Sequence, residues 1–235
     1  MSIQEPSARP GATTGAGGVL VTAFAPFGGR STNTSALVAD ALAARWAGPE
    51  PLRVEVLPVS FARARTALTA LVEDQSPALV LCLGEAGGRD RLGLERVALN
   101  LMDARIPDED GHSPVDLPVE AGGPLALMGS LPVKACFARL RAREFPVEVS
   151  MTAGTYVCNA TYYALMRLLA DRPAARGGFV HVPALPDLMS GPDASPHPAP
   201  SSVREVEVLA EAVETILLTS LSVAEDLALT AGRED

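Results

Sequence analysis

The chain has 235 residues, of which 48% are hydrophobic and 20% are charged, enough for one domain with a sizeable core. Its formal net charge of −9 argues against nucleic-acid binding, which needs a basic surface. Three cysteines and three histidines occur without a C-x-x-C or H-E-x-x-H motif, so we expect no disulfide framework, no metal and no other cofactor.

The two ends of the chain have no clear apolar pattern. Residues 1–18 are polar and rich in Gly, Ala and Pro, which predicts a mobile tail rather than a signal peptide. Apolar runs fall short of the roughly 20 residues of a membrane span. We therefore expect a cytoplasmic protein with reduced thiols, no membrane partner, a single domain over 19–221, and a fraying end over 222–235.

Strands and helices are predicted to alternate along the chain. An apolar strand over 19–25 is followed by the loop PFGGRSTNTS and a helix over 35–47, capped by Thr34 or Ser35. The later strands are expected at 53–60, 78–84, 95–107, 147–154 and 177–183. The later helices are expected at 61–74, 132–143, 160–172 and 202–221, the last one after a Pro/Ser-rich loop over 187–201.

This alternation predicts the fold class. Several strands are apolar on both faces, which is typical of an α/β domain whose mixed, mainly parallel central sheet is covered by helices on both sides. Ligands of such sheets bind at the carboxyl ends of the strands. The glycine-rich loops after strands 19–25 and 78–84 are expected at that edge.

Cys158 is the candidate nucleophile. It lies where strand 147–154 gives way to the helical stretch 160–172. Unpaired backbone N–H groups and the positive end of the helix dipole favour a thiolate there, and a thiolate is the nucleophile in cysteine chemistry. Cys82, inside an apolar strand, and Cys136, on an amphipathic helix, fit the alternative of small buried hydrophobes.

A base and an orienting carboxylate would complete the chemistry. His181 follows Cys158 by 23 residues (181 − 158), the length of one helix and the next strand, and parallel neighbouring strands would bring both to one sheet edge. It is either a hydrogen-bonded core histidine or a general base. Glu95, Asp103 and Asp108 compete for the role of fixing the imidazole, with surface carboxylates as the alternative.

Five stretches form a specific combination of motifs. They are VLVTAFAPFGGRSTNTS, LGEAGGRDRLGLERVALNLMDARIPDEDG, GSLPVKA, VSMTAGTYVCNATYYALM and GGFVHVPALP, which cover most of residues 19–186. By their order and spacing, the chain resembles the pyroglutamyl peptidase I (pyrrolidone-carboxylate peptidase) family of cytosolic cysteine peptidases.

The resemblance implies a single three-layer α/β/α domain and an omega-peptidase. Such an enzyme removes the N-terminal pyroglutamyl residue from peptides and amides through a thioester acyl-enzyme, without a metal. Carried over by motif, Cys158 in YVCN is the nucleophile, His181 in FVHVP the base, and Glu95 in LERVALN the orienting carboxylate. Because members are often oligomeric, a homodimer or homotetramer is expected.

The resemblance also implies a substrate pocket. Phe24 and Phe27 match ring-binding aromatics, Asn33 matches a pocket-side asparagine, and Arg105 matches an arginine near the active site. We expect six residues to bind substrate: Phe24, Phe27, Asn33, Glu85, Arg105 and Val157.

Several positions depart from the family pattern without removing a triad residue. They are Ala23 and Ala25 for a glycine and an acidic residue, Thr34 within N-P-S, Glu85 for glutamine, Glu109 within P-D-N-x-G, and Ala160 within C-N-H. An ionised Glu85 accepts hydrogen bonds but cannot donate them. If backbone atoms hold the lactam ring, the departure at Glu85 is tolerable. We expect Glu85→Gln to preserve or improve turnover of a pyroglutamyl substrate.

Two other functions remain open on sequence. One is a cysteine amidohydrolase acting on a different small cyclic or acylated amide. The other is a non-catalytic small-molecule-binding α/β module, which would have no need for Cys158, His181 and Glu95 together.

Overall fold

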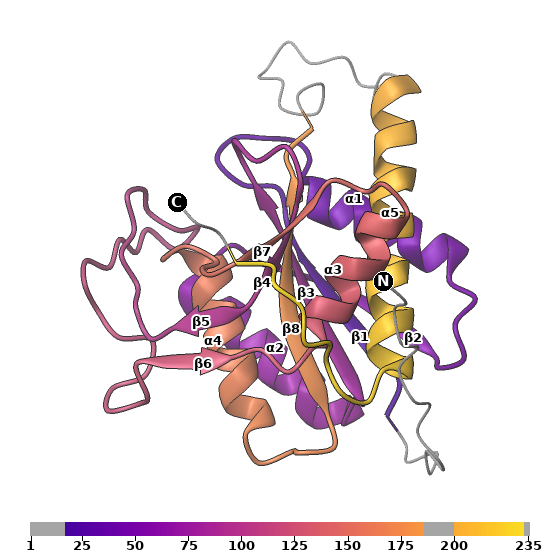
Figure 1. Cartoon of the computed structure of the whole chain (residues 1–235). Helices are drawn as coiled ribbons and strands as arrows, with labels where there is room; N and C mark the ends of the chain where they lie inside the picture. The colour runs from indigo at the N-terminus through magenta and orange to yellow at the C-terminus, as the bar shows by residue number, and fades with distance from the viewer. Residues whose placement is uncertain (1–16, 186–199, 233–235) are drawn as a thin grey trace.

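The computed structural model describes residues 17–185 and 200–232 (Figure 1). The elements in chain order are β1 (Val19–Phe24), α1 (Thr34–Arg45), β2 (Leu52–Leu57), α2 (Phe61–Gln75), β3 (Leu79–Ala86), β4 (Leu92–Glu95), β5 (Val97–Leu99), β6 (Ala126–Met128), α3 (Val133–Ala142), β7 (Val147–Ser150), α4 (Val157–Leu169), β8 (Arg176–Pro183) and α5 (Pro200–Ser222). Nearly all of the expected tail over 1–18 and loop over 187–201 lies outside the described residues.

The central sheet has six strands in the order β2-β1-β3-β8-β4-β7. Neighbouring strands are parallel except for the β8–β4 pair, which is antiparallel. The strands β5 and β6 form a separate antiparallel pair. The predicted α/β fold with a mixed, mainly parallel sheet is therefore confirmed.

Helices cover both faces of the sheet, as Figure 1 shows. One apolar core lies between the sheet and α1, α3 and α5, and the other lies between the sheet and α2 and α4. Side chains alternate along each strand, so successive residues contribute to opposite cores. In the part of the chain described, no helix combines the length and the apolar run that crossing a membrane requires.

The single strand predicted over 95–107 is wrong. β4 ends at Glu95, and β5 leaves the main sheet to pair with β6. The amide of Asn159 on α4 explains the break, because it donates to Leu99 O and accepts from Leu99 N, both at 2.9 Å. The apolar residues of this stretch therefore cover α4 instead of extending the sheet.

Two helix ends differ from the sequence expectation. Asn33, and not Thr34 or Ser35, caps α1, since its side chain accepts from Ser35 N at 3.0 Å. Asp226 accepts from the backbone N–H groups of Lys134 and Ala135 at the start of α3. The chain just after α5 is thus bonded to the domain, where sequence suggested fraying; the domain boundaries themselves stay a prediction.

Candidate active site

The carboxyl ends of β1, β3 and β8 lie at one edge of the sheet because these strands are parallel neighbours. The antiparallel strand β4 begins at the same edge. The two glycine-rich loops, over 25–33 and 87–91, leave the sheet there. The edge predicted for ligand binding is therefore the edge at which the candidate residues gather.

His181 and Glu95 contact each other directly. The ring Nδ1 of His181 lies 2.7 Å from Glu95 Oε1, and both residues are buried. They stand on adjacent antiparallel strands, where Gly93 faces His181 in the register. Asp103 is exposed, and Asp108 accepts from backbone N–H groups of its own loop. Of the three competing carboxylates, Glu95 is the one bound to His181.

Cys158 reaches the same corner from α4. It is the second residue of that helix. A Cβ placed on Gly84 would lie 3.0 Å from the Cys158 Sγ atom, and Gly84 is the register partner of His181 between β3 and β8. The absence of a side chain at Gly84 thus leaves room for the thiol beside the histidine strand.

The reason that sequence analysis gave for this proximity is wrong. The strands β7 and β8 are not parallel neighbours, because β4 lies between them and runs antiparallel to β8. After β7 the chain crosses through residues 151–156 before α4 begins. Cys158 therefore approaches His181 from the helix layer and not from a shared pair of strand ends.

The thiol of Cys158 is also not the low-pKa group that a helix start suggested. Burial raises its pKa to about 12, and the negative charge of Glu95 adds to the effect. A backbone N–H and Arg89 act in the opposite direction. Burial likewise raises the pKa of Cys82 and Cys136 to about 12, so accessibility distinguishes Cys158, which is partly exposed while the other two are buried.

Aromatic side chains line the region beside Cys158. The ring of Phe24 lies 6.5 Å from that of Phe179, and the ring of Phe27 lies 5.8 Å from that of Tyr156. Tyr156 also meets Phe61 edge-on at 5.3 Å. Tyr156 and Phe61 were not predicted from the sequence, although the position of Tyr156, two residues before the cysteine, could have indicated it.

Three other expected substrate-binding residues, Val157, Asn33 and Arg105, differ in burial and in their contacts. Val157 is buried in the core next to Cys158 in the chain. The side chain of Asn33 is already used, since it donates to Ala25 O and accepts from Ser35. Arg105 is exposed. These three are not brought together as one set of substrate contacts.

Glu85 points away from the thiol. It follows Gly84 on β3, and successive strand residues face opposite sides of the sheet. Its carboxylate forms an ion pair with Arg30 and accepts from Thr34 N at 2.7 Å. Burial works to raise the pKa of Glu85, but the bonds from Arg30 and Thr34 outweigh it and lower the pKa. The ionised Glu85 therefore connects β3 to the loop that carries Phe27.

Three potential metal ligands lie together elsewhere. Ligand atoms of Asp108, Asp110 and His112 lie within 4.8 Å of one another. Asp108 Oδ1 accepts from the backbone of Asp110 and His112, and Oδ2 accepts from Phe61 N. Arg63 binds Asp110. These bonds occupy the carboxylates and fasten the loop to the start of α2, a structural role.

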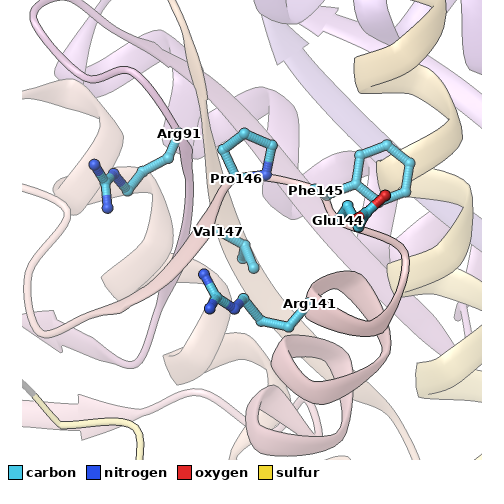
Figure 2. Close-up of a pocket in the computed structure, with 6 residues that line it drawn as sticks. All are labelled: Arg91, Arg141, Glu144, Phe145, Pro146 and Val147. Carbon is cyan, nitrogen blue, oxygen red and sulfur yellow. The ribbon is translucent and has the colours of Figure 1, made fainter.

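A pocket of about 470 Å³ lies outside this corner (Figure 2). Its lining residues are Arg91, Arg141, Glu144, Phe145, Pro146 and Val147. The guanidinium of Arg91 is bound to the carboxylate of Asp90. None of the candidate catalytic residues lines this pocket.

Comparison with known proteins identifies the family. A sequence model described as pyroglutamyl peptidase matches residues 18–219. A pyrrolidone-carboxylate peptidase of Clavibacter michiganensis subsp. michiganensis is 41% identical over 217 residues, 92% of this chain and 99% of that protein. One from Klebsiella pneumoniae is 41% identical over 215 residues, 92% and 98% of the two chains.

Solved structures agree with the sequence relatives. The crystal structure of pyroglutamyl peptidase I from Bacillus amyloliquefaciens has a TM-score of 0.80 at 33% identity and covers 90% of this chain and 98% of that chain. Pyrrolidone carboxyl peptidase from Thermococcus litoralis gives a TM-score of 0.80 at 34% identity with the same coverage. With the sequence model, the sequence relatives and the fold in agreement, the chain belongs to the pyroglutamyl peptidase family of cysteine peptidases.

Proposed function

We propose that Cys158, His181 and Glu95 carry out the family's reaction in this chain, the hydrolytic removal of an N-terminal pyroglutamyl residue from peptides and amides. The observation that carries the proposal is the 2.7 Å contact between His181 Nδ1 and Glu95 Oε1, at the sheet position where Cys158 Sγ lies against Gly84. Each of the three groups then has one role.

Catalysis begins with a proton transfer. Glu95 holds Nδ1 of His181, which leaves Nε2 to accept the proton of the Cys158 thiol. Burial keeps the thiol protonated at rest, so the transfer is coupled to attack on the carbonyl carbon. The sulfur–carbon bond forms as the carbonyl π bond opens, and the oxyanion is held by the Cys158 backbone N–H at the start of α4.

The intermediate then collapses to a thioester. The imidazolium of His181 gives its proton to the leaving amine as the carbon–nitrogen bond breaks. Water, deprotonated by the now neutral His181, attacks the thioester and releases pyroglutamate. The proton returns to Cys158, so the enzyme is regenerated without a metal or another cofactor.

Specificity arises from the aromatic corner and nearby backbone. Phe24, Phe27 and Val157 form an apolar slot for the flat lactam ring, supported by Tyr156 against Phe27. Backbone groups of residues 84–89 pair with the lactam N–H and C=O. A substrate without those groups leaves protein atoms unpaired, which discriminates strongly against it.

Substitution of the nucleophile tests this assignment. Cys158→Ala and Cys158→Ser should abolish release of a chromogenic amine from a pyroglutamyl amide, whereas Cys136→Ala should retain it if the protein folds. Undiminished turnover in the Cys158 variants would refute the mechanism. A matched prolyl amide, which lacks the ring carbonyl, should be a poor substrate for the unaltered enzyme; equal turnover would favour a broader cysteine amidohydrolase.

We also propose that the chain self-associates. Exposed apolar side chains gather on the segment that includes β6, among them Val115, Leu117, Leu125 and Met128. A second copy of the chain would cover such a surface and give a homodimer or homotetramer. Light scattering in solution measures the mass of the particle, and the mass of a single chain would contradict this.

We also propose a cytoplasmic location, because a reducing cytoplasm would keep the Cys158 thiol available. Fractionation of the cell compartments tests this.

A further inference from the structure

Glu95 has one more partner than a triad carboxylate needs. Its Oε1 lies 2.7 Å from His181 Nδ1 and also 2.7 Å from Nη1 of Arg89. Its Oε2 is buried and, among the described residues, has no hydrogen-bond partner. A guanidinium and an imidazole therefore share one oxygen of a carboxylate that is closed off from water.

Arg89 can reach Glu95 because the residue that it crosses, Gly93, has no side chain. Arg89 leaves β3 in the glycine-rich loop and crosses Gly93, where a Cβ would collide with its Nη1. Its Nη2 donates to Thr152 O at 3.4 Å. The side chain is 27% exposed, whereas Glu95 is fully buried. Arg89 thus spans from the loop to the end of β7, with Glu95 beneath it.

The charge of the site explains why this contact matters. Moving the Cys158 proton to His181 creates a thiolate and an imidazolium beside the ionised Glu95. The site carries the same net charge before and after this transfer, zero with Arg89 and −1 without it. Arg89 acts on the transfer because its positive charge offsets the repulsion between Glu95 and the new thiolate. A net charge in a site of low dielectric is strongly unfavourable. Glu95 raises the pKa of Cys158 and Arg89 lowers it, the directions expected from this balance.

Other groups around the site do not supply the missing positive charge. Tyr162 on α4 donates its hydroxyl to Glu95 O, and Cys82 on β3 is held as a neutral thiol by a pKa raised to about 12 through burial. Glu148 on β7 is acidic and lies 4.0 Å from Arg89. Glu85 lies on the opposite face of the sheet. Arg89 is the cation in contact with the triad among the described residues.

We propose that Arg89 is a positioning residue of the catalytic site, which neutralises Glu95 and thereby allows Cys158 to pass its proton to His181 near neutral pH. This inference rests on the proposed roles of the three triad residues. Arg89 acts through Glu95 and does not itself touch the substrate.

The test measures the thiol directly, without turnover. The rate at which iodoacetamide alkylates Cys158 is followed against pH by peptide mass spectrometry, in the unaltered enzyme and in Arg89→Gln, Arg89→Lys and Arg91→Gln. Arg89→Gln should slow labelling at pH 8 by about 10-fold or more and move its pH midpoint upward, because a positive charge that lowers the pKa of the thiol is lost. Arg89→Lys should restore most of the rate, and Arg91→Gln, whose guanidinium binds Asp90 outside the site, should match the unaltered enzyme.

Turnover provides the second readout. In Arg89→Gln, kcat should fall about 10- to 100-fold while KM changes less than about 3-fold, since the lactam pocket is untouched. An unchanged alkylation profile in folded Arg89→Gln, or an equal shift in Arg91→Gln, would overturn the inference. If Arg89→Gln does not fold, Arg89→Lys serves as the test, because it keeps the positive charge. A 10-fold loss of labelling in folded Arg89→Lys would then overturn the inference. Activity surviving in Cys158→Ala would instead remove the proposed function itself.

Discussion

Two glutamates, the partly buried Glu85 and the buried Glu95, lie near the same edge of the sheet, and each is bound by an arginine from a glycine-rich loop. Both oxygens of Glu85 are bound, by the fork of Arg30 and by Thr34 N. Glu95 has two partners on Oε1 and none described on Oε2. The fully bonded carboxylate, Glu85, holds a loop in place, and the incompletely bonded one, Glu95, is the proposed triad residue.

The difference has a physical basis. A buried polar atom without a partner costs about 1–3 kcal/mol, so a fold keeps one where a function requires it. Glu95 keeps that oxygen beside a histidine and a thiol, whereas Glu85 uses every contact to fasten the loop over 25–33. The bonding of the two carboxylates thus distinguishes two residues of the same type.

The largest effect should come from removing the charge of Glu95. Glu95→Gln should lower kcat by about 10²- to 10⁴-fold, because the amide no longer stabilises the imidazolium and also permits the wrong tautomer of His181. KM should change little, since Glu95 lies beneath the histidine and away from the lactam slot. Steady-state kinetics on a pyroglutamyl amide checks this, with circular dichroism to confirm folding. A loss below about threefold would place Glu95 outside the catalytic unit.

The sequence alone predicted part of the fold, but not the charged contacts of the two glutamates. The apolar strands over 19–25, 78–84 and 177–183 predicted the parallel core of the sheet, whereas the role of Cys158 as nucleophile stays a prediction. The charges were harder to predict, because Arg30 and Glu85 are 55 positions apart and Arg89 reaches Glu95 only by crossing Gly93. Side-chain partners of that kind depend on packing, which periodicity does not encode.

Burial also reversed one expectation that local sequence supported. The start of α4 favours a thiolate, yet desolvation of Cys158 outweighs that effect and raises its pKa to about 12. The stretch over 95–107 similarly had the apolar pattern of one strand, but Asn159 binds its backbone at Leu99 and turns it out of the sheet. In both cases a tertiary contact outweighed the local signal.

A smaller effect is expected at Glu85. Sequence suggested that Glu85→Gln would preserve or improve turnover, but the bonds to Arg30 and Thr34 now predict a loss. We expect about 1–3 kcal/mol lower free energy of unfolding, because hydrogen bonds to a charged group are lost. KM should rise a few-fold through the loop carrying Phe27, while kcat stays within about 2-fold.

Urea unfolding and steady-state kinetics measure both quantities. Arg30→Gln should reproduce the rise in KM, because it breaks the same ion pair from the other side. Glu55→Gln is the matched control, since Glu55 pairs with Arg53 and both side chains are exposed. A fall in kcat as large as that of Glu95→Gln would erase the distinction between the two glutamates.

The smallest effect should be a dependence of stability on pH at Glu85. Its pKa lies below the ordinary value of 4.5, because the bonds from Arg30 and Thr34 outweigh burial. A group whose pKa is depressed by folding contributes stability that is present above the unfolded pKa and is lost as pH falls through the folded pKa. The unaltered enzyme should therefore exceed Glu85→Gln in stability at neutral pH, and the gap should narrow as pH falls below 4.5.

Urea midpoints of the two proteins across this pH range give the gap directly, without a contribution from groups that they share. Asp90→Asn is the control, since the pKa of Asp90 is also lowered by a bond from Arg91, but both side chains are exposed and solvent screens the pair. Its gap should stay near zero. A gap for Glu85→Gln that does not narrow in acid would mean that Arg30 holds the protonated carboxyl as well as the ionised one, and the contrast with Glu95 would then rest on shape and not on charge.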